Sequence, residues 1–160
     1  MWPNNSSGLN PTIAQKAGFK DRSAFYAERA KLYPPKPFDD AARAEYLATA
    51  NAFVAKTRTL LPAYFGMTPA FRIEVVREPA FSEVAGGAAH ASAPSPDGKR
   101  PARTYVHLVG TIPDPAALYT LMCHESVPGH NTQGDIQVRQ QGGPKFRSVT
   151  GYVAFGEGWG

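Results

Sequence analysis

Residues 123–130, with the sequence CHESVPGH, contain side chains that commonly bind a metal ion and use it in catalysis. His124 and His130 offer neutral imidazoles, and Glu157, near the end of the chain, offers a carboxylate. Two imidazoles and a carboxylate are the three protein ligands of many catalytic zinc sites, which keep a fourth position open. Glu125 would then be free to take a proton from a water molecule that the metal activates. The residue types therefore predict a metal site with a general base beside it.

The spacing of the two histidines requires a break in the helix that carries them. In the common motif His-Glu-x-x-His, the two imidazoles are four residues apart and share one helix face. His124 and His130 are six residues apart, and six residues turn a continuous helix by roughly 240°. Pro128 has no N–H for the carbonyl group of His124, and Gly129 allows backbone angles that are closed to other residues. We predict that Pro128 and Gly129 end the helix and turn His130 back towards His124.

Other interpretations of this segment stay open. A histidine beside a glutamate on a half-buried helix is often only a hydrogen-bonded polar pair. Two imidazoles and one carboxylate also hold iron or manganese, so a divalent metal other than zinc is an alternative. Cys123 adjoins His124, but neighbours on a helix point about 100° apart, so we interpret the thiol as a buried apolar group and not as a nucleophile.

Two motifs resemble those of a known family. They are HExxPGHxxQ at residues 124–133 and YxxFxEGW at residues 152–159. Both are similar to signature sequences of the bacterial domain of unknown function 885 (DUF885) family, and so is the segment at residues 101–109. The resemblance extends from about Phe25 to the last residue. Because that family is similar to zinc-dependent peptidases of the thermostable carboxypeptidase type, the resemblance implies a mostly helical metallohydrolase.

Three features depart from the family pattern. Asn131 stands where the family usually has a second histidine, which makes His130 the expected ligand. His107 stands in a predicted strand where asparagine is expected, and we predict that it contacts the substrate or faces solvent. Family members are several times longer, so we interpret the 160 residues as an internal fragment of a larger metallohydrolase, inactive by itself.

The combined motifs predict a zinc-dependent hydrolase, and more specifically a peptidase, with Glu125 as the general base and a peptide or peptide-like substrate. Gln133 is predicted to orient a ligand, and Tyr152 to pack beside the site or to contact the substrate. An alternative is a catalytically inactive domain derived from the family, with a binding or structural role.

The elements that position these residues are predicted to be mainly helical, with a small antiparallel β element, an α+β fold. Apolar residues recur at helical spacing, and an Asp precedes several of the predicted helices as a capping residue. Predicted helices cover residues 21–32, 40–61, 115–125 and about 146–159. The β-branched segments 72–77 and 104–109 are predicted strands, and the intervening residues 79–101, which are rich in Gly and Pro, are expected to form a loop.

Composition limits the class of protein further. A length of 160 residues fits a single partial domain, in which residues 1–20 are expected to be irregular. The net charge is +4, but Lys and Arg are scattered, so we predict no nucleic-acid partner. No apolar run approaches the roughly 20 residues of a membrane helix, and one cysteine excludes an internal disulfide. The oligomeric state and the compartment, cytoplasm or periplasm, are left open.

Overall fold

The computed structural model describes residues 11–66, 68–87, 89–140, 143–144 and 151–160. The chain divides into two compact units, Met1–Lys36 and Pro37–Gly160, and each is described by itself. The interpretation of the chain as one partial domain stays a prediction.

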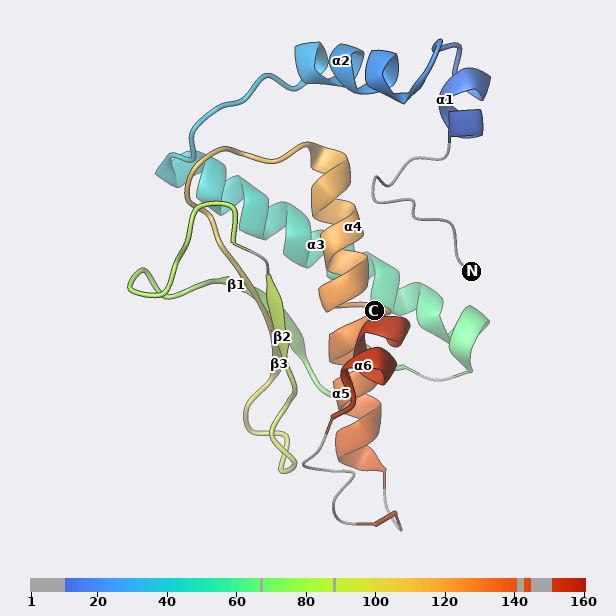
Figure 1. Cartoon of the computed structure of the whole chain (residues 1–160). Coiled ribbons are helices and arrows are strands. Elements are labelled where there is room, and N and C mark those ends of the chain that lie inside the picture. The colour runs from blue at the N-terminus through green and yellow to red at the C-terminus, as the bar shows by residue number, and fades with distance from the viewer. Residues whose placement is uncertain (1–10, 67, 88, 141–142, 145–150) are drawn as a thin grey trace. The chain divides into compact units, whose positions relative to one another are not determined.

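The described part of the first unit, residues 11–36, contains two helices, α1 (Pro11–Lys16) and α2 (Arg22–Leu32) (Figure 1). Helix α2 begins where it was predicted, because the carboxylate of Asp21 accepts a hydrogen bond from the N–H of Ala24 at 2.9 Å. The expectation that residues 1–20 are irregular is wrong for α1. Ala14 in this short helix is fully buried, and Phe19 packs edge-on against Phe25 of α2, so contacts beyond the helix stabilise it.

The described residues of the second unit form one long helix, a small sheet and three shorter helices, which confirms the predicted α+β class. In chain order its elements are α3 (Asp40–Phe65), β1 (Ile73–Arg77), β2 (His90–Ser92), β3 (Ala102–Val106), α4 (Pro115–Glu125), α5 (His130–Arg139) and α6 (Val153–Trp159). Among the described residues, no helix combines the length and apolar character needed to cross a membrane.

The sheet is mixed, and one predicted pairing is wrong. The strand order is β1-β3-β2, with β2 antiparallel to β3 but β1 parallel to β3. Residues 79–101, expected to be a loop, contain β2. The chain leaves β1, crosses to the far side of the sheet, forms β2 and returns through residues 93–101, so that β3 lies in the middle. The edge strand β2 therefore separates the two predicted strands along the chain.

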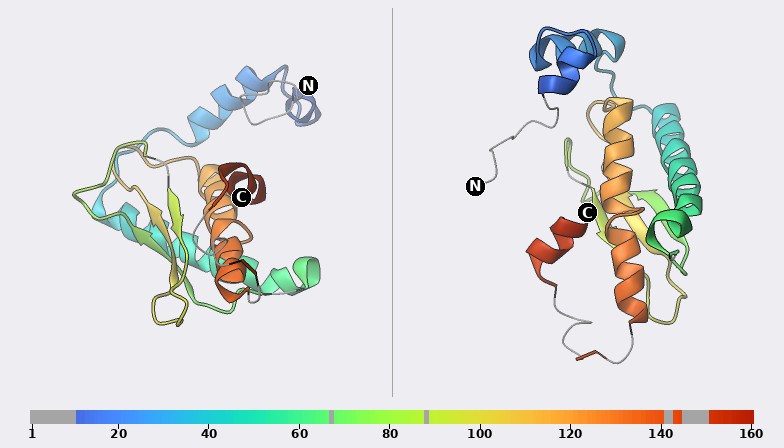
Figure 2. Two further views of the ribbon diagram at one scale, coloured as in Figure 1. Left: turned by 60° about the horizontal axis from the view of Figure 1, so that its bottom comes forward. Right: turned by 90° about the vertical axis from the view of Figure 1, so that its right-hand side faces the viewer.

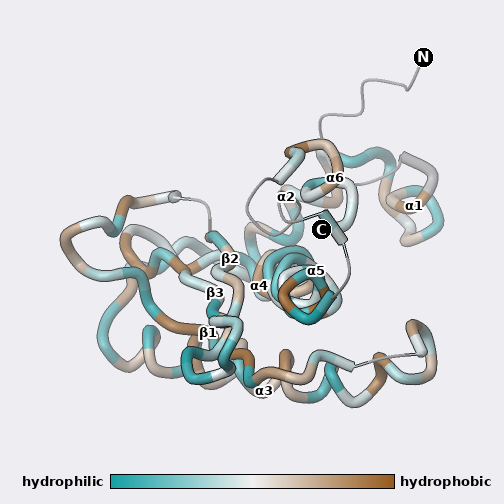
Figure 3. The backbone as a smooth tube through the Cα atoms, turned by 90° about the horizontal axis from the view of Figure 1, so that it is seen from below, coloured by the Kyte–Doolittle hydropathy of each residue, from teal (hydrophilic) through white to brown (hydrophobic). Residues whose placement is uncertain are grey.

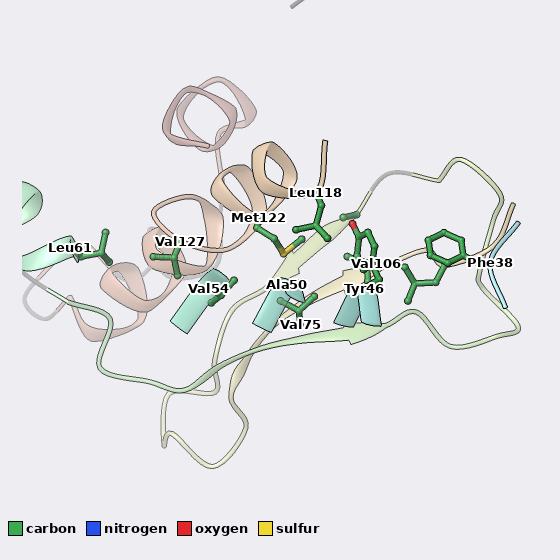
Figure 4. Close-up of a cluster of buried hydrophobic side chains, with 12 residues drawn as sticks. Phe38, Tyr46, Ala50, Val54, Leu61, Val75, Val106, Leu118, Met122 and Val127 are labelled. Carbon is green, nitrogen blue, oxygen red and sulfur yellow. The ribbon is translucent and has the colours of Figure 1, made fainter. Parts of the chain in front are cut away.

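Helix α3 provides one wall of the hydrophobic core (Figure 4). It continues to Phe65, four residues beyond its predicted end, and includes Pro62. It stops at Gly66, whose φ of 65° is in the left-handed region that favours glycine. The predicted recurrence of apolar residues at helical spacing is partly confirmed, since Leu61 is buried but Leu60 is 50% exposed. The core side chains include Tyr46, Ala50, Val54 and Leu61 of α3, Val75 of β1, Val106 of β3, Leu118 and Met122 of α4, and Val127.

Helices α4 and α5 follow one another end to end and carry the predicted site (Figure 2). Helix α3 packs against α4 and β1, whereas α5 packs against β3 and β2. Seen along the axis of α4 and α5, α3 and α6 lie on opposite sides of them (Figure 3). Helix α6 thus lies on the side of the α4–α5 junction that the core does not occupy.

Candidate metal centre

The predicted helix break is confirmed. Helix α4 ends at Glu125, the peptide bond between Val127 and Pro128 is cis, and α5 begins at His130. Gly129 is needed for space, because a Cβ atom there would overlap the carbonyl oxygen of His124. Its φ is −71° and its ψ is −139°, and the close approach of the two backbone segments leaves room only for a glycine.

Three donor side chains converge at this break. They are His124 at the end of α4, His130 at the start of α5 and Glu157 in α6, and their ligand atoms all lie within 4.8 Å of one another. The Nε2 atoms of His124 and His130 lie 3.5 Å and 3.7 Å from the carboxylate oxygens of Glu157. Around a tetrahedral zinc ion with bonds of 2.0–2.1 Å, donor atoms are about 3.4 Å apart. The three residues therefore fit a single metal ion with small side-chain adjustments.

Glu125 lies beside this cluster on the buried face of α4. The residue is 7% exposed, and one carboxylate oxygen lies 4.0 Å from Nε2 of His124. Burial raises the pKa of Glu125, and the imidazoles of His124 and His130 oppose that shift. A carboxyl group with a raised pKa next to a reaction site is suited to accept a proton and return it.

Helix α6 is attached to the break through its last residues. The indole N–H of Trp159 donates a hydrogen bond of 2.9 Å to the carbonyl oxygen of Pro128, and its ring packs near Phe65 of α3. This contact brings Glu157, two residues earlier, over the two imidazoles. The helix begins at Val153, later than predicted, and Phe146, where it was expected to begin, lies outside the described residues.

A cleft of about 670 Å³ opens in front of the three donor residues. Its walls are β2 with the residues that flank it, the facing side of α4 and α5, and the first part of α6. Gln133 and Tyr152, which were predicted near the site, both line this cleft.

His107 is not among the residues that line the cleft. It follows the end of β3, the central strand, and its Nδ1 atom accepts a hydrogen bond from the N–H of Val84 at 3.1 Å. Its ring also leaves no room for a side chain at Gly87. The structure thus places His107 in the packing of the β1–β2 connection, and the strand beside the site is β2 instead of the strand that was predicted to meet the substrate.

The sequence analysis missed the buried polar face of α5. Asn131, treated as a departure from the family, is fully buried and donates a hydrogen bond of 2.7 Å to the hydroxyl group of Thr104. Asp135, also fully buried, accepts the N–H groups of Ala70 and Phe71 at 2.9 Å each and pairs with Arg139. Ile136 and Val138 of the same helix are only partly buried. The only signal in the sequence was the four-residue spacing of Asn131 and Asp135.

Comparisons with known proteins agree with this fold. The family model described as "Bacterial protein of unknown function (DUF885)" matches residues 10–160. The chain therefore belongs to the DUF885 family of bacterial proteins. A crystal structure described as "the putative lipoprotein from Colwellia psychrerythraea" is similar, with a TM-score of 0.77 and 24% sequence identity. The match covers 93% of this chain and 26% of that one. A search of curated proteins gave no match.

Proposed function

We propose that this chain carries the metal-binding centre of a zinc-dependent hydrolase and that the hydrolase is a peptidase. The observation that carries the proposal is the convergence of His124, His130 and Glu157 on one point beside the buried carboxyl group of Glu125. Two imidazoles and one carboxylate are a common donor set for catalytic zinc, and the cleft gives a substrate access to the open side.

Each of these residues has a defined part in the proposed reaction. A bound divalent cation would polarise the substrate carbonyl group and make a water molecule more acidic. The carboxylate of Glu125 accepts the proton of the attacking water and passes it to the leaving amine. His124, His130 and Glu157 hold the cation.

A peptide substrate is proposed because β2 borders the cleft. It is one of the two edge strands of the sheet, and within the described residues no strand pairs with its outer side. Ala89, Ala91 and Ala93 line the cleft, and their small side chains leave the backbone accessible. An extended peptide can add to such an edge as a further strand.

The substitution Glu125→Gln tests the role of the base. The amide keeps the shape of the side chain but cannot accept the proton, so we expect about one zinc ion per chain and a loss of turnover of about 10²–10⁴-fold. Both measurements use the longest form of the protein that shows activity. Elemental analysis measures the bound metal, and mass spectrometry of a peptide mixture measures cleavage. The variant His124→Ala should lose the metal as well. Undiminished cleavage by Glu125→Gln would remove Glu125 from this role.

The alternative function, an inactive binding or structural domain, makes a different prediction. Such a domain would purify without stoichiometric metal and would not take up zinc at neutral pH. Reconstitution with zinc, manganese and iron(II) in turn, followed by the same cleavage assay, separates zinc from the other cations that this donor set can hold.

A further inference from the structure

Three buried polar side chains meet behind the helix break. Thr104 of β3, Ser126 after α4 and Asn131 of α5 are all fully buried. The hydroxyl groups of Thr104 and Ser126 lie 2.8 Å apart, and the amide of Asn131 donates to the hydroxyl group of Thr104 at 2.7 Å. Thr104 is thus bonded to both ends of the break.

Ser126 also connects the two helices through its backbone. Its N–H donates to the carbonyl oxygen of Met122 and closes the last turn of α4 at 3.0 Å. Its own carbonyl oxygen accepts the N–H of Thr132 in the first turn of α5 at 3.3 Å. The two helix ends are therefore held to each other and, through Thr104, to the sheet.

Two of these residues lie next to the proposed ligands in the sequence. Ser126 is two residues after His124, and Asn131 is the residue after His130. Burying polar groups costs free energy unless they are hydrogen-bonded, and an apolar trio would fill the same space without that requirement. Hydrogen bonds also add direction, because each bond between buried groups favours one relative arrangement of the segments that it joins.

We infer that Thr104, Ser126 and Asn131 are positioning residues for the metal centre. They hold the end of α4 and the start of α5 so that the imidazoles of His124 and His130 keep their edge-to-face approach, with ring centroids 4.6 Å apart. This inference rests on the proposed function, because it assigns a purpose to the geometry of the metal centre. None of the three side chains belongs to the donor cluster itself.

The matched substitutions Thr104→Val and Thr104→Ser test the inference in the whole 160-residue chain. Valine keeps the shape and removes the hydroxyl group, whereas serine keeps the hydroxyl group. Partners that orient metal ligands typically contribute 10–100-fold to metal affinity. We therefore expect Thr104→Val to bind zinc about 10–100-fold more weakly and to change the visible absorption spectrum of the cobalt(II)-loaded protein. Thr104→Ser should restore both properties.

A control separates positioning from general stability. Phe38→Ala removes buried atoms at the end of the core opposite Leu61 and Val127 (Figure 4), and should lower the melting temperature while the zinc affinity and the cobalt spectrum stay as in the wild type. Ser126→Ala removes one of the two bonds to Thr104 and should shift affinity and spectrum in the same direction as Thr104→Val. It also replaces Thr104→Val if that variant fails to fold.

Two outcomes overturn the inference and differ from each other. Wild-type affinity and an unchanged spectrum in Thr104→Val and Ser126→Ala would refute the positioning role and leave the proposed function intact. A wild-type chain that binds neither zinc nor cobalt would refute the proposed function and the inference together.

Discussion

At the scale of single residues, the candidate metal centre depends on one glycine as much as on its donor side chains. The backbone at Gly129 approaches the carbonyl oxygen of His124 so closely that no side chain fits. This approach is what allows α5 to start directly after α4 ends, and it places His130 beside His124. A residue without metal-binding chemistry therefore controls the distance between two predicted ligands.

Gly129→Ala should separate the two imidazoles. Because the added Cβ atom meets backbone and not a movable side chain, the break itself must shift, and we expect a loss of at least about 2 kcal/mol in the free energy of unfolding. Zinc affinity should fall as well. Urea denaturation and competition with a chromophoric chelator measure the two effects.

Gly158→Ala is the matched control for this substitution. A Cβ atom at Gly158 has nothing within 4 Å, and alanine favours a helix by up to about 1 kcal/mol over glycine. This variant should be at least as stable as the wild type. Equal behaviour of the two variants would contradict the steric role of Gly129.

At the scale of elements, the features that sequence could predict are those set by local chemistry. The missing N–H of Pro128 and the six-residue spacing of the histidines were sufficient to predict the break between α4 and α5. Asp114 and Pro115 likewise predicted the start of α4, where the carboxylate of Asp114 accepts the N–H of Ala116 at 2.8 Å. Such signals act within a few residues and do not depend on the rest of the fold.

The features that sequence missed depend on contacts between distant segments. The parallel pairing of β1 with β3 follows from β2, a three-residue strand too short to show a pattern. The buried face of α5 is polar, so hydrophobic periodicity could not reveal it. Asn131 bonds a residue 27 positions away, and Asp135 bonds one 65 positions away. Patterns within a short stretch of sequence cannot reveal hydrogen-bond partners at these separations.

The connection between β1 and β2 gives a prediction about acid stability. Glu83 in this connection has a side chain that is 2% exposed, pairs with Arg77 and accepts the N–H of Leu108 at 2.5 Å. Hydrogen bonding to Arg77 lowers the pKa of Glu83 below its ordinary value of 4.5, although burial opposes the shift. The charged carboxylate therefore stabilises the fold above pH 4.5, and this contribution is lost as the pH falls through the lowered pKa.

Glu83→Gln should be less stable than the wild type by about 1.5–3 kcal/mol at neutral pH, since a hydrogen-bonded charge is lost. The difference should shrink as the pH falls below 4.5. Urea denaturation across this range measures it, with Glu45→Gln, a change at an exposed residue of α3, as the control. A constant difference at every pH would show that the carboxylate of Glu83 does not stabilise the fold through its charge.

At the scale of the whole molecule, the proposed metal ion would join a helix that packs into the hydrophobic core to a helix that does not. Its three donors come from α4, α5 and α6. Helix α4 contributes Leu118 and Met122 to the core, whereas α6 has seven residues and none of them is buried. Isolated helices this short are unstable in water, so the attachment of α6 depends on the few contacts that it makes at the break.

Zinc should therefore protect α6 more than any other element. In hydrogen exchange, adding zinc should slow the amides of Phe155 and Gly156, which bond the carbonyl oxygen of Tyr152 at 3.0 Å and 2.9 Å, while the central amides of α3 change little. The whole fold should gain about 2.7 kcal/mol when free zinc reaches 100 times its dissociation constant. Glu157→Ala should abolish the protection of α6 and keep weaker zinc binding through the two histidines. If the wild type binds zinc and the exchange of α6 does not change, Glu157 is not a ligand, and the donor set has to be completed by another residue.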